Sequence, residues 1–204
     1  MMENNKIRNY IIIMLISVVL NFSLYYVAHV YHLPMWMDSV GTVYAAVMLE
    51  PAAGLLVGFA TNFFQSAAIY GVHSLVYYLI SAVAALSFGV TLRKNGYISF
   101  KKMPKSVIYF VVFGTIAATF LTMWVTNGVP DSNWERFFYE KALNYGIPQV
   151  FACMWGSFVL KVADGIIIAF LTPILYGITP SNMVTGCLNE KLSWRAPFLK
   201  KSEK

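Results

Sequence analysis

The sequence predicts an all-α integral membrane protein, a single bundle of six transmembrane helices with both termini in the cytoplasm. Its 204 residues are 58% hydrophobic and only 12% charged, whereas a soluble domain carries about 25% charged residues. The mean hydropathy is +0.62. The apolar residues lie in long runs separated by short polar segments. We therefore predict one membrane domain over residues 1–204 and exclude a separate soluble catalytic domain.

Breaks in the apolar runs divide the chain into six predicted spans. About 20 apolar residues suffice to cross a bilayer. The spans cover residues 10–30, 39–49, 52–69, 75–92, 106–126 and 149–171, and a polar tail covers 179–204. The last span is expected to end at Leu171 because Pro173 follows. The loop 127–148 contains NWERFFYEKALNYG, which predicts a short amphipathic helix at the membrane surface.

The second and third spans are predicted to form a hairpin that turns at Glu50-Pro51. Proline is well tolerated in the first turn of a helix, where its missing N–H has no intrahelical partner anyway. Small residues at four-residue spacing let helix backbones approach closely in lipid. We expect helix contacts, within the bundle or with a partner subunit, at Gly41, Ala45, Gly54 and Gly58.

The distribution of basic residues predicts the orientation. Cytoplasmic loops of membrane proteins are enriched in lysine and arginine. With six spans, twelve basic residues fall on the side of the termini: two before the first span, five between Arg93 and Lys105, and five in the tail. The opposite side has only Arg136 and Lys141, and the remaining one, Lys161, lies in the sixth span. Five or seven spans would weaken this asymmetry.

The sequence offers no chemistry of its own. It has no Gly-rich phosphate-binding loop, no HExxH and no Ser–His arrangement. Cys153 and Cys187 fit no metal motif and are not expected to form a disulfide. We predict no catalytic residue, no cofactor and no metal site, and therefore not an enzyme.

Three segments carry a resemblance to a known family: MDSVGT at 37–42, EPAAGLLVG at 50–58, and Thr61-Asn62. The chain resembles the substrate-binding S components of energy-coupling factor transporters, which are six-helix membrane proteins of about this length. The resemblance implies high-affinity binding and uptake of a vitamin or related micronutrient. It also implies as partners a transmembrane coupling subunit and two ATPase subunits. The location would be the plasma membrane of a prokaryote, and no nucleic acid would be bound.

An alternative function is kept open. Similar six-helix modules occur as membrane sensors or accessory proteins without transport activity. A sensor would normally continue into a cytoplasmic signalling domain, and this chain carries a short basic tail.

The resemblance also implies a ligand site in the outer half of the bundle, beneath the loops after spans one, three and five. Ligand sites combine aromatic walls with a few polar groups. The predicted ligand-binding residues are Trp36, Asp38, Asn62, His73, Tyr77, Trp124, Asn127, Trp155 and Lys161. Other interpretations exist for several: the aromatic residues are also typical interfacial anchors, Asp38 could cap the second helix, and His73 could be a solvated loop residue.

Lys161 and Asp164 are charged residues deep in the sixth predicted span. Residues three apart on a helix share a face, so the two can pair, and pairing lowers the cost of charge in the membrane. We predict a structural ion pair. A second interpretation is that Lys161 meets an anionic ligand group while Asp164 holds it.

Overall fold

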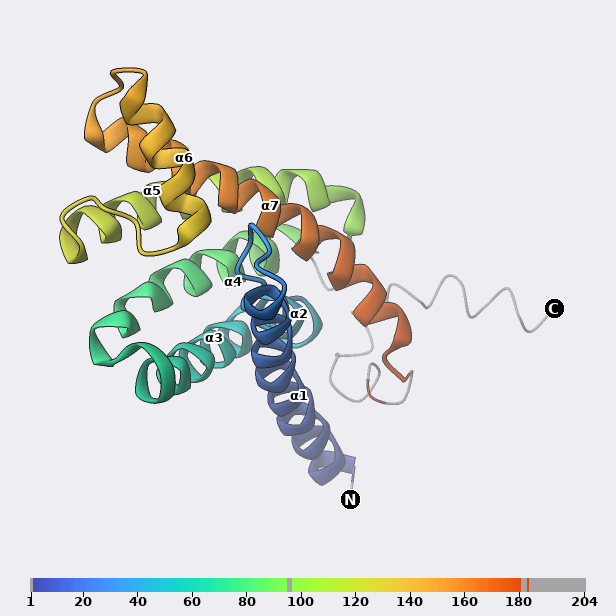
Figure 1. Ribbon diagram of the computed structural model, residues 1–204. Helices are drawn as coiled ribbons and strands as arrows, with labels where there is room; N and C mark the ends of the chain where they lie inside the picture. The colour runs from blue at the N-terminus through green and yellow to red at the C-terminus, as the bar shows by residue number, and fades with distance from the viewer. Residues whose placement is uncertain (1, 95–96, 181–182, 184–204) are drawn as a thin grey trace.

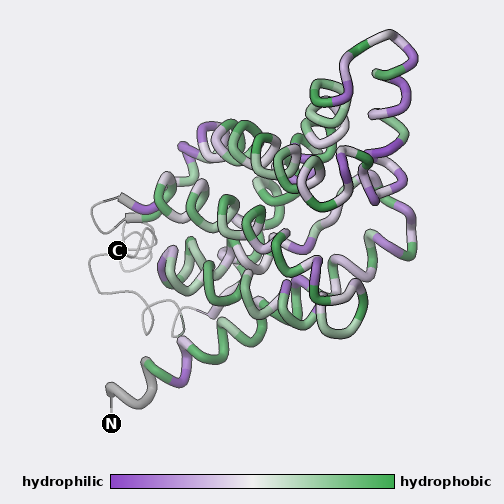
Figure 2. The backbone as a smooth tube through the Cα atoms, turned by 90° about the vertical axis from the view of Figure 1, so that its left-hand side faces the viewer, coloured by the Kyte–Doolittle hydropathy of each residue, from purple (hydrophilic) through white to green (hydrophobic). Residues whose placement is uncertain are grey.

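The computed structural model describes residues 2–94, 97–180 and 183. Within these ranges the regular secondary structure is helical apart from one short antiparallel pair of strands, β1 (Arg93–Lys94) and β2 (Tyr97–Ile98). Most of the predicted tail 179–204 lies outside the described residues, namely residues 181–182 and 184–204, which include Cys187. The long helices are mostly hydrophobic along their length (Figure 2).

The helices follow one another closely along the chain (Figure 1). They are α1 (Met2–Val30), α2 (Val40–Met48), α3 (Pro51–Gln65), the π-helical turn η1 (Ser66–Tyr70), the 3₁₀ helix η2 (Val72–Tyr77), α4 (Tyr78–Leu92), the 3₁₀ turn η3 (Phe100–Lys102), α5 (Met103–Val125), α6 (Asn133–Asn144) and α7 (Gln149–Ile178). The predicted amphipathic helix in the loop 127–148 is thus α6, and α3 begins at Pro51, as the hairpin predicts.

Five helical segments of the described residues are long and apolar enough to cross a membrane. They cover Ile7–Val30, Pro51–Tyr70, Val72–Leu92, Phe100–Val125 and Gln149–Ile178. The predicted segment 39–49 corresponds to α2, which has nine residues. A helix rises about 1.5 Å per residue, so α2 alone is too short to cross. The protein is therefore a helical membrane protein with five candidate spanning helices and a short helix among them.

All nine residues of α2 are buried, and α1, α3, α4 and α7 pack around it. Its N-terminus is held by Asn21 of α1, whose Oδ1 accepts the backbone N–H groups of Gly41 (2.6 Å) and Thr42 (3.3 Å). The Asn21 Nδ2 group donates to the hydroxyls of Thr42 and Thr61, both at 3.0 Å. Since the first N–H groups of a helix have no intrahelical acceptor, Asn21 supplies one from the neighbouring helix.

Residues 31–39 carry the chain into the bundle before α2 begins. Trp134 Nε1 of α6 donates to the carbonyl of His32 at 2.7 Å, so this segment starts at the α6 end, far from the start of α1 (Figure 1). At the other end of α2, Arg93 donates to the carbonyl of Val47 at 2.8 Å. Tyr10, near the start of α1, donates to Glu50 at 2.8 Å. Residues 32–50 thus lead from one end of the bundle to the other.

The predicted end of the last span at Leu171 is wrong. The helix α7 continues through Pro173 to Ile178. Proline removes one backbone hydrogen bond from a helix interior. The bonds beyond it persist, and the Thr179 N–H reaches the carbonyl of Leu175 at 3.2 Å. Prolines are tolerated inside membrane helices where neighbouring groups compensate for the lost bond.

The four small residues expected at helix contacts all pack inside the chain. Ala45 is fully buried. A Cβ added to Gly41 would collide with Ser17 of α1, one on Gly54 would lie 2.9 Å from the carbonyl oxygen of Thr42, and one on Gly58 would lie 3.0 Å from Ser81. These positions therefore form helix contacts within the bundle, which is one of the two alternatives that the sequence left open.

Candidate ligand-binding site

A cavity of about 300 Å³ lies at the α6 end of the bundle. Its wall comes from the segment 31–39, from α3 with η1 and η2, and from the start of α6, with α4, α5 and α7 completing it. The structure therefore brings together the three loops that follow α1, α3 and α5. Ligand pockets have volumes from about 300 Å³ upward, so the space suits a small molecule.

Six of the nine predicted ligand-binding residues line this cavity: Trp36, Asp38, Asn62, His73, Tyr77 and Lys161. The other three lie elsewhere. Trp124 is 66% exposed on the surface of α5. Asn127 follows α5 with a positive φ of 52°, and its carbonyl accepts a hydrogen bond from Gln149 at 2.8 Å. Trp155 faces outward from α7, beside a shallow apolar groove against α5.

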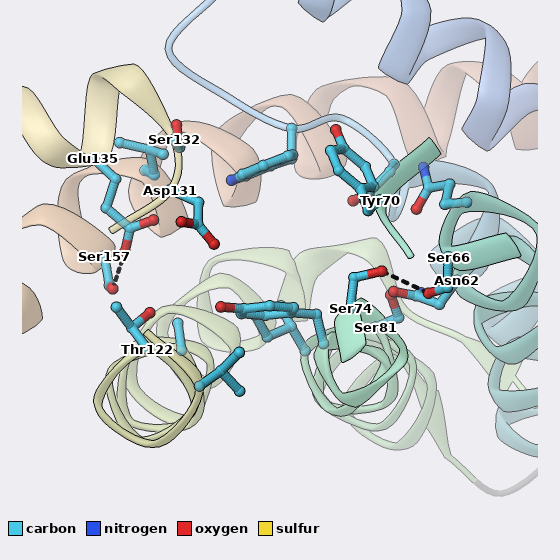
Figure 3. A pocket seen from close by; sticks show the side chains of 18 of the residues that line it. Asn62, Ser66, Tyr70, Ser74, Ser81, Thr122, Asp131, Ser132, Glu135 and Ser157 are labelled. Atoms are coloured by element: carbon cyan, nitrogen blue, oxygen red, sulfur yellow. Dashed lines mark hydrogen bonds between the residues drawn. The ribbon is translucent and has the colours of Figure 1, made fainter. Parts of the chain in front are cut away.

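One end of the cavity is lined by hydroxyl and amide groups (Figure 3). Asn62 donates to Ser81 Oγ at 2.8 Å and to the carbonyl of Gly58 at 2.9 Å. The hydroxyls of Ser66 and Ser74 are joined at 2.8 Å. Gln65 is 5% exposed, and its buried Nε2 has no hydrogen-bond partner among the described residues. This end therefore has a hydrogen-bond donor, the Gln65 amide, without an acceptor among the described residues.

The opposite end is acidic (Figure 3), with Asp131 just before α6 and Glu135 in its first turn. Glu135 accepts a hydrogen bond from the hydroxyl of Ser157 on α7. The helices α6 and α7 approach closely at this point because residue 156 is glycine. A Cβ there would lie 2.7 Å from the carbonyl oxygen of Glu135. Burial raises the pKa of the Glu135 carboxyl, and the Ser157 hydrogen bond and Lys161 oppose that shift.

The ion pair predicted between Lys161 and Asp164 is present. Lys161 Nζ lies 3.3 Å from Asp164 Oδ2, and both residues are 5% exposed. Asp164 Oδ1 accepts the backbone N–H groups of Trp36 at 2.8 Å and Met37 at 3.3 Å. Asp164 thus binds the segment 31–39 to α7, while Lys161 reaches the cavity wall.

Asp38 does not cap α2. The N-cap residue is Ser39, and the acceptor for the first free N–H groups is Asn21. Asp38 lines the cavity instead, and its Oδ1 accepts a hydrogen bond from the Ser39 hydroxyl at 3.2 Å. It adds a carboxyl group near the Lys161–Asp164 pair.

Sequence reasoning missed the acidic end. Asp131 and Glu135 lie in a segment whose amphipathic pattern indicates a helix at the membrane surface, and nothing in that pattern shows which helix it covers. Ser66, Ser74 and Ser157 are also new. Ser81 belongs to a stripe of small residues in α4, which predicts packing and gives no sign of a cavity.

Comparisons with protein-family models, with curated proteins and with solved structures give no match to this chain. Among the described residues, no group of three or more His, Cys, Asp or Glu side chains could hold a metal ion. The geometry of the cavity is therefore the observation that bears on function.

Proposed function

We propose that this protein binds a small organic ligand within the membrane and acts as the substrate-binding subunit of an importer, in the manner of an energy-coupling factor S component. The observation that carries the proposal is the cavity at the α6 end, which combines aromatic side chains, an unfilled amide donor and charged groups. Such a mixture is typical of small-molecule sites. The ligand would be a vitamin or related micronutrient.

The proposal includes six passages through the membrane, five made by the long helices and one by residues 32–50. Two hydrogen bonds support this sixth passage, because the one at His32 lies at the α6 end of the bundle and the one at Val47 lies at the opposite end. Both termini then lie in the cytoplasm of a prokaryotic cell, with the basic segment 93–105 on the same side and α6 outside. The sequence has no phosphate-binding loop, so partner ATPases and a coupling subunit would supply the energy.

A labelling experiment tests this orientation. In a cysteine-free background, Asn144→Cys in α6 should react with a membrane-impermeant thiol reagent in intact cells, since this residue is exposed at the proposed outer end. Lys101→Cys, which is exposed at the opposite end, should react after the membrane is permeabilised. The reverse pattern, or labelling of both residues in intact cells, would refute the orientation.

A pair of tryptophan variants tests ligand binding. Native mass spectrometry of the purified protein should detect a co-purified small molecule. Trp36→Ala removes an aromatic wall of the cavity and should weaken its binding by about 1–3 kcal/mol, as for a buried aromatic contact. Trp155→Ala is the matched control because it lies outside the cavity and is 49% exposed.

Ligand binding in the site must differ between the two tryptophan variants. Equal retention of the molecule by folded Trp36→Ala and Trp155→Ala proteins would place the ligand somewhere other than this cavity. A bound molecule without uptake, in cells that contain the coupling subunit and ATPases, would favour a sensor over a transporter.

A further inference from the structure

We infer that the ligand is an organic cation: a positively charged group lies beside Asp131 and Glu135, and a hydrogen-bond acceptor lies beside Gln65 at the other end. This inference rests on the proposed ligand-binding function and names the chemical class of its ligand. Three observations carry it: the charges of the lining, the absence of a metal cluster among the described residues, and the unpartnered amide.

Carboxyl groups outnumber ammonium groups in the lining of the cavity. Asp38, Asp131 and Glu135 contribute carboxyl groups, whereas Lys161 contributes the ammonium group. That ammonium group is already compensated, since Asp164 lies 3.3 Å away. An anionic ligand would therefore compete with carboxylates for Lys161, whereas a cationic ligand would meet the carboxyl groups of Asp131 and Glu135. This balance argues against an anion at Lys161.

The side chains at the acidic end of the cavity suit a positively charged group on the ligand. Figure 3 shows Asp131 and Glu135 on the same side of the cavity, with Ser157 and Thr122 beside them. Burial raises the pKa of Glu135, and a positive group beside the carboxylate would stabilise its ionised form. Trp36 and Tyr77 line the same space, and aromatic faces attract cations.

The cation is an organic group rather than a metal ion. The described residues include no cluster of three metal-ligating side chains, and metal ions such as Ca²⁺ require six or more oxygen ligands. A protonated amine or a charged ring needs fewer partners, because one or two carboxylates and an aromatic wall can balance its charge.

The end of the cavity at Gln65 indicates that the ligand also carries a hydrogen-bond acceptor. Gln65 is 5% exposed, and its Nε2 lacks a hydrogen-bond partner within the described chain. An unfilled buried donor costs free energy, so a ligand acceptor at this position would improve binding. Neighbouring hydroxyls of Ser66 and Ser74 already bond to each other. A carbonyl, hydroxyl or ring nitrogen on the ligand fits this requirement.

Three soluble probes of the same aromatic skeleton test the charge. Tyramine is a cation, tyrosol is neutral, and 4-hydroxyphenylacetate is an anion. At millimolar concentration, tyramine should raise the melting temperature of the full-length protein in detergent more than the other two. Glu135→Gln keeps a hydrogen-bond acceptor for Ser157 and should weaken tyramine binding by about 10- to 100-fold, the loss of one charge-assisted contact. Asp131→Asn, at an exposed position, should act in the same direction.

Glu140→Gln is the matched control, since Glu140 lies on the same helix, is exposed and is not part of the cavity lining. Tyramine binding should not change in this variant. Equal or greater stabilisation by tyrosol or 4-hydroxyphenylacetate overturns the inference. No stabilisation by tyramine, or undiminished tyramine binding in both folded carboxyl variants, overturns it as well.

Native mass spectrometry separates this failure from failure of the proposed function. A neutral or anionic co-purified molecule that Trp36→Ala releases would refute the positive charge and leave ligand binding standing. Absence of any co-purified molecule, together with no effect of any probe, would refute both.

Discussion

Replacement of Gly41 by alanine should remove most of the folded protein. The added Cβ would collide with the backbone carbonyl of Ser17, and it would lie 2.9 Å from Asn21 Oδ1. Backbone cannot move aside as a flexible side chain does, so α1 and α2 would have to separate. Overpacking usually costs about 1–3 kcal/mol and occasionally more, and here we expect about 3 kcal/mol or above. Size-exclusion chromatography in detergent would show this as loss of the monodisperse peak.

Gly177→Ala provides the control. Among the residues that the structure describes, none lies within 4 Å of a Cβ at this position in α7, so this variant should elute and melt as the wild type does. A Gly41→Ala protein with the same melting temperature as Gly177→Ala would show that α1 and α2 do not pack as described.

The sequence predicts the long helices and the hairpin well because these depend on local properties. Apolar runs of sufficient length give the five candidate spanning helices, and Pro51 gives the start of α3. The path of residues 31–39 depends instead on distant acceptors. Asp164 lies more than a hundred residues away from Trp36, and Asn21 reaches the start of α2 from another helix. No local pattern indicates such contacts.

The candidate site was predictable where polar groups lie inside apolar segments. Asn62 and Lys161 are costly in a membrane without partners, and both line the cavity. The tryptophans could not be told apart in this way, because all three lie near the ends of predicted spans. Trp36 faces the cavity while Trp124 and Trp155 face outward. That difference depends on how each helix or loop is turned in the bundle, which composition does not specify.

Replacement of Lys161 by methionine should destabilise the protein by about 3–5 kcal/mol, the usual cost of leaving one partner of a buried ion pair uncompensated. Asp164 is 5% exposed and would lose the ammonium group 3.3 Å away. A lower melting temperature in detergent would report this loss. Wild-type stability in Lys161→Met would show that the ion pair with Asp164 does not stabilise the fold.

Two double variants then separate the roles of Asp164. Lys161→Met with Asp164→Asn removes both charges and keeps an oxygen acceptor for the N–H groups of Trp36 and Met37, so stability should return. Lys161→Met with Asp164→Leu removes the acceptor too, and each buried N–H left unpaired costs about 1–3 kcal/mol. Equal stability of the two double variants would contradict an anchoring role for Asp164. If the asparagine variant is stable and still binds the co-purified ligand, Lys161 serves the structure; if it is stable and releases the ligand, Lys161 contacts it.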